Sequence, residues 1–122
     1  MTTQEIANKW AEYCRSGQWD KAQQELYASD AVSIEMEGAE GYPQKVQGLE
    51  AIADKAKQWE QMVEEFHGVE IEGPIVSGDY FTASMNMDIK MKDQPRRNDE
   101  EIAIFKVKDS KIVSEQFFYG VE

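Results

Sequence analysis

The chain has 122 residues, 41% of them hydrophobic, which is enough for one domain with a sizeable core and too little for two. Its formal net charge of −11 produces a negative field that disfavours nucleic acid and anionic membrane surfaces as partners. A single cysteine, Cys14, cannot form an internal disulfide, and no segment approaches the about 18 consecutive apolar residues of a membrane span. We therefore expect one soluble, cytoplasmic domain over residues 1–122.

Two short helices are predicted at the start of the chain. Thr2-Thr3-Gln4-Glu5 has the pattern of a capping box, so the first helix should begin there. A second helix is predicted over residues 19–27. Gly17 ends the first helix, whose apolar residues recur at helical spacing: Ile6, Ala7, Trp10, Ala11, Tyr13 and Cys14.

The next segment predicts a strand and a loop. After Asp30-Ala31, the apolar residues Val32, Ile34 and Met36 alternate with Ser33, Glu35 and Glu37, as in a strand with two different faces. Residues 38–48 contain Gly41 and Pro43 and indicate a loop, with a short extended piece near residues 45–47.

A third helix and a run of strands complete the chain. The helix has one apolar face that can cover a sheet: Leu49, Ile52, Ala53, Ala56, Trp59, Val63 and Phe66. Strands are predicted over residues 67–76, 80–92, 99–108 and 111–119. In the second of these we assign the apolar members to the inside: Phe81, Ala83, Met85, Met87 and Ile89.

The last two strands form a hairpin, for which we predict a three-residue loop over residues 108–110 with Ser110 near the left-handed region. Val107 then lies opposite Lys111, Phe105 opposite Val113, and Ala103 opposite Glu115. One face carries Glu101, Ala103, Phe105, Val107, Val113, Glu115, Phe117 and Tyr119, and the other carries Ile102, Ile104, Ile112 and Phe118. Because both faces are substantially apolar, we expect one to line a cavity and the other to meet a second subunit in a homodimer.

The order of these elements predicts an α+β fold in which helices cover a curved sheet around an interior cavity. The chain also resembles a SnoaL-like protein of the nuclear transport factor 2-like superfamily. The resemblance rests on Tyr27-Ala28-Ser29-Asp30-Ala31-Val32, Gly48-Leu49-Glu50-Ala51-Ile52, Val69-Glu70-Ile71-Glu72-Gly73-Pro74, Gly78-Asp79-Tyr80-Phe81 and the segment from Lys111 to Tyr119.

This resemblance implies a conical roll, with N-terminal helices packed on a curved mixed, mostly antiparallel sheet, that is often a homodimer. The cavity serves ketosteroid isomerases, polyketide cyclases, dehydratases, epoxide hydrolases or simple binding in different members. At the positions of the isomerase residues this chain has Glu35 for the proton-shuttling aspartate, Trp10 for the oxyanion tyrosine, and Ile102 or Ala103 for the partner acid. The isomerase donor pair is therefore absent, and steroid isomerisation is not assigned. Tyr13 is the alternative donor.

The candidate catalytic residues are Glu35, Glu101, Glu115 and Tyr119. An apolar pocket and the crowding of like charges would raise the pKa of such glutamates toward neutrality, which suits a general acid or base. The alternative is that they are solvated strand positions in a chain with 24 acidic residues. We prefer Glu35 as the base, Glu101 or Glu115 as the acid, and Tyr119 or Tyr13 as a hydrogen-bond donor.

His67 is the single histidine, and it either points into the cavity or lies packed at its rim. No metal-ligand spacing is present, so neither a zinc or iron site nor any other cofactor is predicted, although carboxylate-only coordination of a hard cation stays open.

The expected ligand is a small hydrophobic molecule, bound by Trp10, Tyr13, Trp59, His67, Met85, Phe105 and Phe117. Most of these side chains also suit an ordinary core. Two functions remain: an enzyme that performs cofactor-independent acid-base catalysis, of the isomerase, cyclase, dehydratase or hydrolase type, and a non-catalytic dimeric ligand-binding or interaction module.

Overall fold

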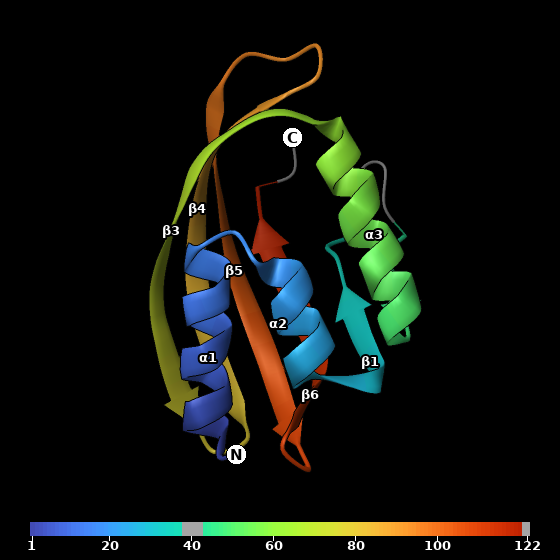
Figure 1. The fold of residues 1–122 in the computed structure, drawn as a ribbon, viewed down its shortest axis with the longest axis vertical. Helices are drawn as coiled ribbons and strands as arrows, with labels where there is room; N and C mark the ends of the chain where they lie inside the picture. Colours follow the sequence, from blue (N-terminus) through green and yellow to red (C-terminus); the bar gives the residue numbers. More distant parts are fainter. Residues whose placement is uncertain (38–42, 121–122) are drawn as a thin grey trace.

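A computed structural model describes residues 1–37 and 43–120 of the chain (Figure 1). Its helices are α1 (Thr3–Arg15), α2 (Trp19–Leu26) and α3 (Leu49–Met62). Its strands are β1 (Tyr27–Ile34), β2 (Lys45–Gln47), β3 (Val63–Ser77), β4 (Tyr80–Met91), β5 (Arg97–Lys108) and β6 (Lys111–Tyr119).

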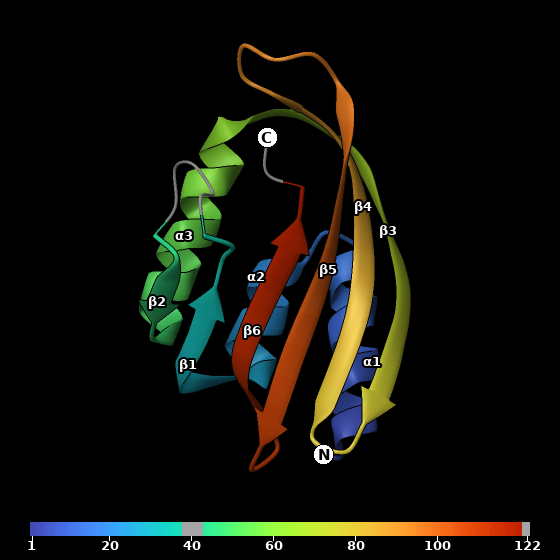
Figure 2. The same ribbon diagram turned by 180° about the vertical axis from the view of Figure 1, so that it is seen from behind.

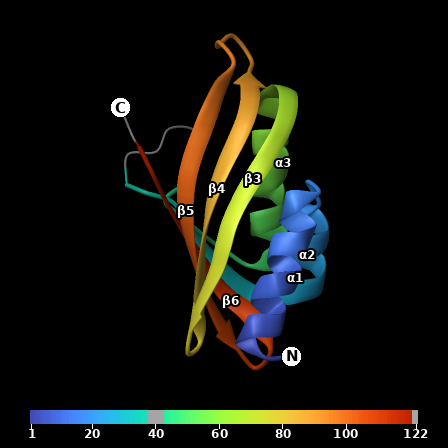
Figure 3. The same ribbon diagram turned by 90° about the vertical axis from the view of Figure 1, so that its left-hand side faces the viewer.

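Within the described residues the strands form one six-stranded sheet in the order β2-β1-β6-β5-β4-β3. The pairing of β1 with β6 is parallel, and the other neighbouring strands are antiparallel. The helices lie on one face of the curved sheet (Figure 3), and the view from behind shows the other face uncovered by helices (Figure 2). The predicted α+β fold with a mixed, mostly antiparallel sheet is confirmed.

The first helix begins where the sequence predicts. The Glu5 amide donates to the Thr2 hydroxyl at 3.1 Å, and the Thr2 amide donates to the Glu5 carboxylate at 2.9 Å, so the capping box is complete. Of the predicted apolar stripe, Tyr13 is only partly buried, whereas the remaining members are buried: Ile6, Ala7, Trp10, Ala11 and Cys14. Because that stripe lies against the sheet, α1 closes one side of the core.

Aromatic side chains fill the core between α1 and the strands β4 and β5. The rings of Phe81 and Phe105 are stacked, with centroids 4.5 Å apart, and the Trp10 ring lies 4.6 Å from Phe105. Phe105 is completely buried. This part of the interior is therefore solid protein, and any ligand has to bind elsewhere.

The structure corrects the predicted boundaries around α3 and β1. The helix ends at Met62 rather than near Phe66, because the chain from Val63 onward forms backbone pairs with β4, which override its helical periodicity. Phe66 therefore belongs to β3 and is 42% exposed. Likewise β1 begins at Tyr27, ends at Ile34 and does not include Met36. The predicted short extended piece is confirmed as β2, while residues 38–42 of the predicted loop lie outside the described residues.

The predicted register of the last hairpin is wrong by one residue next to the turn and by two residues further along the strands. Asp109 and Ser110 both have positive φ, at 52° and 61°, and form a two-residue turn closed by the pair Lys108 and Lys111. This turn alone would place Phe105 opposite Ser114, but Val113 has no partner on β5, so Phe105 lies opposite Glu115. An irregularity near Val113 then changes the alternation, so Ile112 is fully buried instead of lying on the outer face.

We expect Phe105→Ala to lower the free energy of unfolding by about 3 to 5 kcal/mol, because it removes a buried ring and leaves a cavity against Trp10 and Phe81. Chemical denaturation would measure the change. The control is Ile75→Ala at a side chain that is 70% exposed, where a loss below about 1 kcal/mol is expected. Equal losses in the two variants would contradict this description of the core.

Candidate functional site

The parallel pairing of β1 with β6 places polar side chains on the face of the sheet that the helices cover. Ser33 lies directly opposite Glu115, and Glu35 follows two residues after Ser33 on the same side. Ser33 is completely buried, and Glu115 is 4% exposed. The interior at this end of the strands is therefore polar, in contrast to the aromatic core under α1.

Glu115 is held by two hydroxyl groups. The Ser33 hydroxyl donates to its Oε2 at 2.6 Å, and the Tyr27 hydroxyl donates to its Oε1. Burial raises the pKa of Glu115, while these two hydrogen bonds and the charge of Lys55 oppose the rise. Burial of Glu115 thus favours its protonated form, whereas the two hydroxyl donors favour its charged form.

Lys55 from α3 connects the two glutamates of this group. Its Nζ donates to Glu35 Oε1 at 2.9 Å and to Ser33 Oγ at 2.5 Å, and the side chains of Lys55 and Glu35 are each 11% exposed. The ammonium also lies over the Phe117 ring, 5.5 Å from its centroid. The sequence reasoning missed Lys55, although its place three residues after the buried Ile52, within the apolar stripe of the helix, was a usable signal.

Tyr119 and Glu101 complete the arrangement from the ends of β6 and β5. The Tyr119 hydroxyl donates to Glu35 Oε2 at 2.7 Å, and Glu101 is the cross-strand partner of Tyr119. Burial, and then the charges of Glu35 and Glu115, raise the pKa of Glu101 to about 8. The pKa of Tyr119 is also raised, chiefly by burial and then by its hydrogen bond to Glu35.

The four predicted catalytic residues are therefore neighbours, and we call Glu35, Glu101, Glu115, Tyr119 and Lys55 the glutamate cluster. At neutral pH it combines an ion-paired carboxylate, a carboxyl group that keeps its proton and a phenol. Such a set can accept a proton from one atom of a molecule and donate a proton to another.

The residues predicted to bind a ligand divide into two groups. Phe117 contacts the Lys55 ammonium, and Met85 is the cross-strand partner of Glu101, so both lie beside the glutamate cluster. Trp10 and Phe105 pack against each other in the solid core, with their ring planes tilted by 55°.

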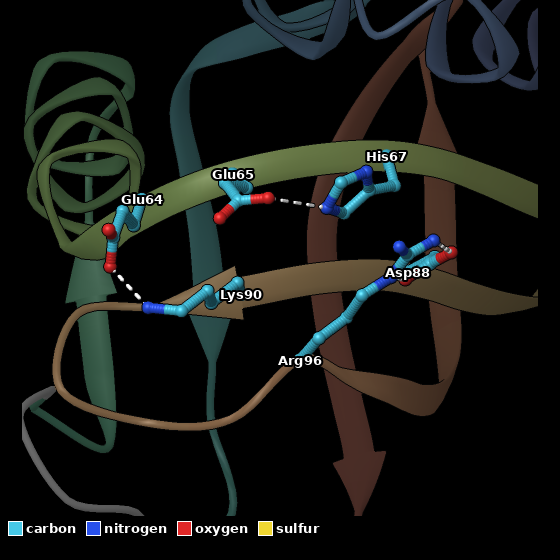
Figure 4. Close-up of polar contacts among 6 residues, drawn as sticks. All are labelled: Glu64, Glu65, His67, Asp88, Lys90 and Arg96. Atoms are coloured by element: carbon cyan, nitrogen blue, oxygen red, sulfur yellow. Dashed lines mark hydrogen bonds and ion pairs between the residues drawn. The ribbon is translucent and has the colours of Figure 1, made fainter.

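The other predicted ligand-binding residues lie elsewhere. Trp59 packs edge-on against Trp19, with ring centroids 5.7 Å apart, and the Tyr13 hydroxyl donates to Glu25. His67 is exposed on β3, where its Nε2 lies 2.9 Å from Glu65, beside the ion pairs of Glu64 with Lys90 and of Asp88 with Arg96 (Figure 4). A surface ion-pair network thus surrounds His67, and its contact is Glu65 rather than a member of the glutamate cluster.

A depression of about 420 Å³ lies mainly on the side of the sheet away from the helices. It is lined by Glu70, Glu72, Ser84, Met85, Asn86, Glu100, Glu101, Ile102 and Phe118. Most of these side chains alternate with the inward-facing ones along the same strands. The depression shares Met85 and Glu101 with the glutamate cluster and its surroundings, but its other lining residues belong to the outer face, so the predicted interior cavity stays a prediction.

Two further properties concern metals and membranes. In residues 1–37 and 43–120, no group of three or more His, Cys, Asp and Glu side chains is arranged to hold a metal ion. Among the helices of the same residues, none has the length and apolarity needed to cross a membrane.

Comparison with known proteins agrees with the fold. The sequence model of the SnoaL-like domain family matches residues 1–119, and the chain therefore belongs to this family. A candidate SnoaL-like polyketide cyclase from Mesorhizobium loti is 33% identical, with a TM-score of 0.90 over 98% of this chain and 100% of its own. No match was found among curated proteins.

Two more distant structures share the fold alone. A hypothetical protein from Catenulispora acidiphila with a ketosteroid isomerase-like fold, solved in complex with trimethylamine, is 23% identical, with a TM-score of 0.75 over 98% of this chain and 88% of its own. An NTF2-like protein of unknown function from Burkholderia pseudomallei is 10% identical, with a TM-score of 0.82 over 98% and 92%. The fold is thus nuclear transport factor 2-like, as the sequence predicts.

The raised pKa of Glu101 predicts a loss of stability with rising pH. Folded Glu101 keeps its proton to about pH 8, whereas an unfolded glutamate loses it near 4.5, so between these values the folded chain binds more protons and the free energy of unfolding falls as pH rises. Glu101→Gln stays neutral and should be more stable than the wild type at pH 8 but similar at pH 4.5. Each unit between the two pKa values corresponds to about 1.4 kcal/mol, so we expect a gain of up to a few kcal/mol.

Chemical denaturation of both proteins from pH 4.5 to pH 8.5 would measure this effect. Glu100→Gln, at the exposed neighbouring position, is the matched control and should follow the wild type. Parallel curves for the wild type and Glu101→Gln would show that Glu101 does not hold its proton in the folded chain.

Proposed function

We propose that the protein binds a small hydrophobic molecule at the glutamate cluster and performs acid-base chemistry on it without a cofactor. The observation that carries this proposal is the placement of an ion-paired carboxylate, Glu35, beside a carboxyl group that keeps its proton, Glu101. Two carboxyl groups with different protonation in one partly buried site are the usual requirement for a base and an acid that act together.

The positions of the groups suggest their roles. Glu35 accepts a proton from a carbon next to a carbonyl group, and Glu101 donates its proton to the carbonyl oxygen, so that an enol forms and no external electron donor is needed. Tyr119 acts as a hydrogen-bond donor, and in the free protein its hydroxyl proton goes to Glu35 and holds that carboxylate in place. Phe117 and Met85 provide the apolar surface for the ligand.

The relatives support this reaction class without fixing the substrate. The family match and the 33% identity to a candidate polyketide cyclase are consistent with carbon acid chemistry. Steroid isomerisation stays unassigned: Trp10 is packed in the core, Ile102 is 51% exposed on the outer face, and Ala103 has no acidic group.

The test is hydrogen exchange in 2-tetralone, a small aromatic ketone with acidic C–H groups, incubated with the protein in D₂O. We expect the wild type to accelerate incorporation of deuterium, and Glu35→Gln to reduce this acceleration by about a hundredfold or more, because the base is removed. The wild-type rate should also fall above about pH 8, where Glu101 loses its proton.

Mass spectrometry of the ketone measures the exchange, and circular dichroism verifies that each variant is folded. Glu37→Gln changes an exposed glutamate two residues further along and should retain the wild-type rate. Full activity of folded Glu35→Gln would remove Glu35 from the mechanism.

A non-catalytic binding module is the second candidate, and one observation favours it. Both oxygens of Glu35 already accept hydrogen bonds, from Lys55 and from Tyr119, so a substrate would have to displace one donor before Glu35 could act as a base. In that case a bound hydrophobic compound is recovered unchanged, and no exchange above the buffer rate occurs.

We also propose that the protein is a homodimer that uses the outer face of the sheet. Ile102, Ile104 and Phe118 are 51%, 39% and 40% exposed there on two adjacent strands. Contiguous exposed apolar side chains of this kind are typical of a protein interface. A second copy would cover them, and two-fold symmetry would bring the same patch from both chains together.

Sedimentation at micromolar concentration tests the dimer. We expect the mass of two chains for the wild type and of one chain for Ile102→Arg, because the variant would bury an unpaired charge in the interface. Met62→Arg, at a side chain that is 46% exposed on the helical side, should remain dimeric. A wild-type mass of one chain would reject the proposal.

A further inference from the structure

We propose that Lys55 is a positioning residue that determines where the protons of the glutamate cluster lie, keeping Glu35 and one oxygen of Glu115 as proton acceptors. This inference rests on the proposed function for its biological meaning, but its physical basis is the hydrogen-bond geometry alone.

The direction of one hydrogen bond is fixed by the chemistry of the donor. A lysine ammonium has hydrogen atoms to donate and no lone pair, so the contact of 2.5 Å between Lys55 Nζ and Ser33 Oγ makes the serine oxygen the acceptor. The single proton of the Ser33 hydroxyl then points to Glu115 Oε2, 2.6 Å away. That oxygen of Glu115 accepts a proton from Ser33 and therefore cannot carry one of its own.

The same ammonium acts directly on Glu35. It lies 2.9 Å from Glu35 Oε1, and both side chains are largely buried, so the carboxylate would be poorly solvated without it. One cation thus forms an ion pair with Glu35 and orients the hydroxyl that contacts Glu115.

The Tyr27 hydroxyl donates to Oε1 of Glu115, so both oxygens of Glu115 accept hydrogen bonds, and the proton that the cluster keeps at neutral pH lies on Glu101. Without Lys55, the Ser33 hydroxyl could rotate and accept a proton from Glu115 Oε2, and the distinction between acid and base would weaken. The titratable groups packed around Lys55 and Glu115 are Tyr27 from β1, Glu35 directly after β1, Glu101 from β5, Glu115 and Tyr119 from β6, and Cys14 from α1.

The experiment is a pH titration of ligand-free protein with ¹³C-labelled glutamate, followed by NMR of the side-chain carboxyl carbons. In Lys55→Met the pKa values of Glu115 and Glu101 should both rise, because the cation that lowers them is gone. We expect the titration midpoint of Glu115 to move upward by about one pH unit or more. Lys55→Arg keeps the charge and should move it by less.

The matched control is Lys57→Met, which removes an exposed lysine from the same helix and should titrate as the wild type does. Lys55→Gln provides a second neutral variant, which retains a donor for Ser33, if the methionine variant does not fold. A folded neutral variant with wild-type midpoints for Glu115 and Glu101 would overturn the proposal.

This readout separates the two proposals, because it uses neither substrate nor turnover. A shifted midpoint in a protein that exchanges no deuterium into 2-tetralone would support the role of Lys55 and reject that activity. An unchanged midpoint in a variant of an active wild type would leave the acid-base function standing and remove Lys55 from it.

Discussion

The parallel pairing of β1 with β6 is the constraint on which the site depends. It places Ser33 directly opposite Glu115 and directs both toward the face that the helices cover. Polar groups in such a position need partners, because their burial without hydrogen bonds is costly. Tyr27 from the beginning of β1 and Lys55 from α3 meet that need. The packing of α3 against this strand pair is therefore part of the chemistry of the site as well as part of the core.

The site holds two carboxyl groups in different protonation states, within a chain whose overall charge is strongly negative. Glu35 has a cation in direct contact, whereas Glu101 lies among like charges and keeps its proton to about pH 8. An apolar replacement of a buried ion pair is often as stable as the pair itself. The pair of Glu35 with Lys55 therefore need not add to stability, and the role proposed for Lys55 gives it an effect on proton positions instead.

Strands β5 and β6 serve two surfaces at once, because successive side chains alternate between the faces of a sheet. Glu101 and Tyr119 lie toward the helices, and Ile102 and Phe118 lie on the outer face. The irregularity near Val113 matters for this division, since it brings Ile112 into the core near the hairpin turn. Binding at one face and association at the other would therefore involve the same two strands, with the sheet backbone between them.

The sequence by itself determined the element order and the start of α1, because capping and hydrophobic periodicity are local properties of the chain. Only the tertiary structure decided that α3 ends at Met62, since pairing with β4 competes with helical periodicity there. It also decided the hairpin register, because Asp109 as well as Ser110 adopts positive φ. Above all it placed Lys55 against Glu35, a contact between segments 20 residues apart that depends on how a helix packs on a strand and leaves little local trace in the sequence.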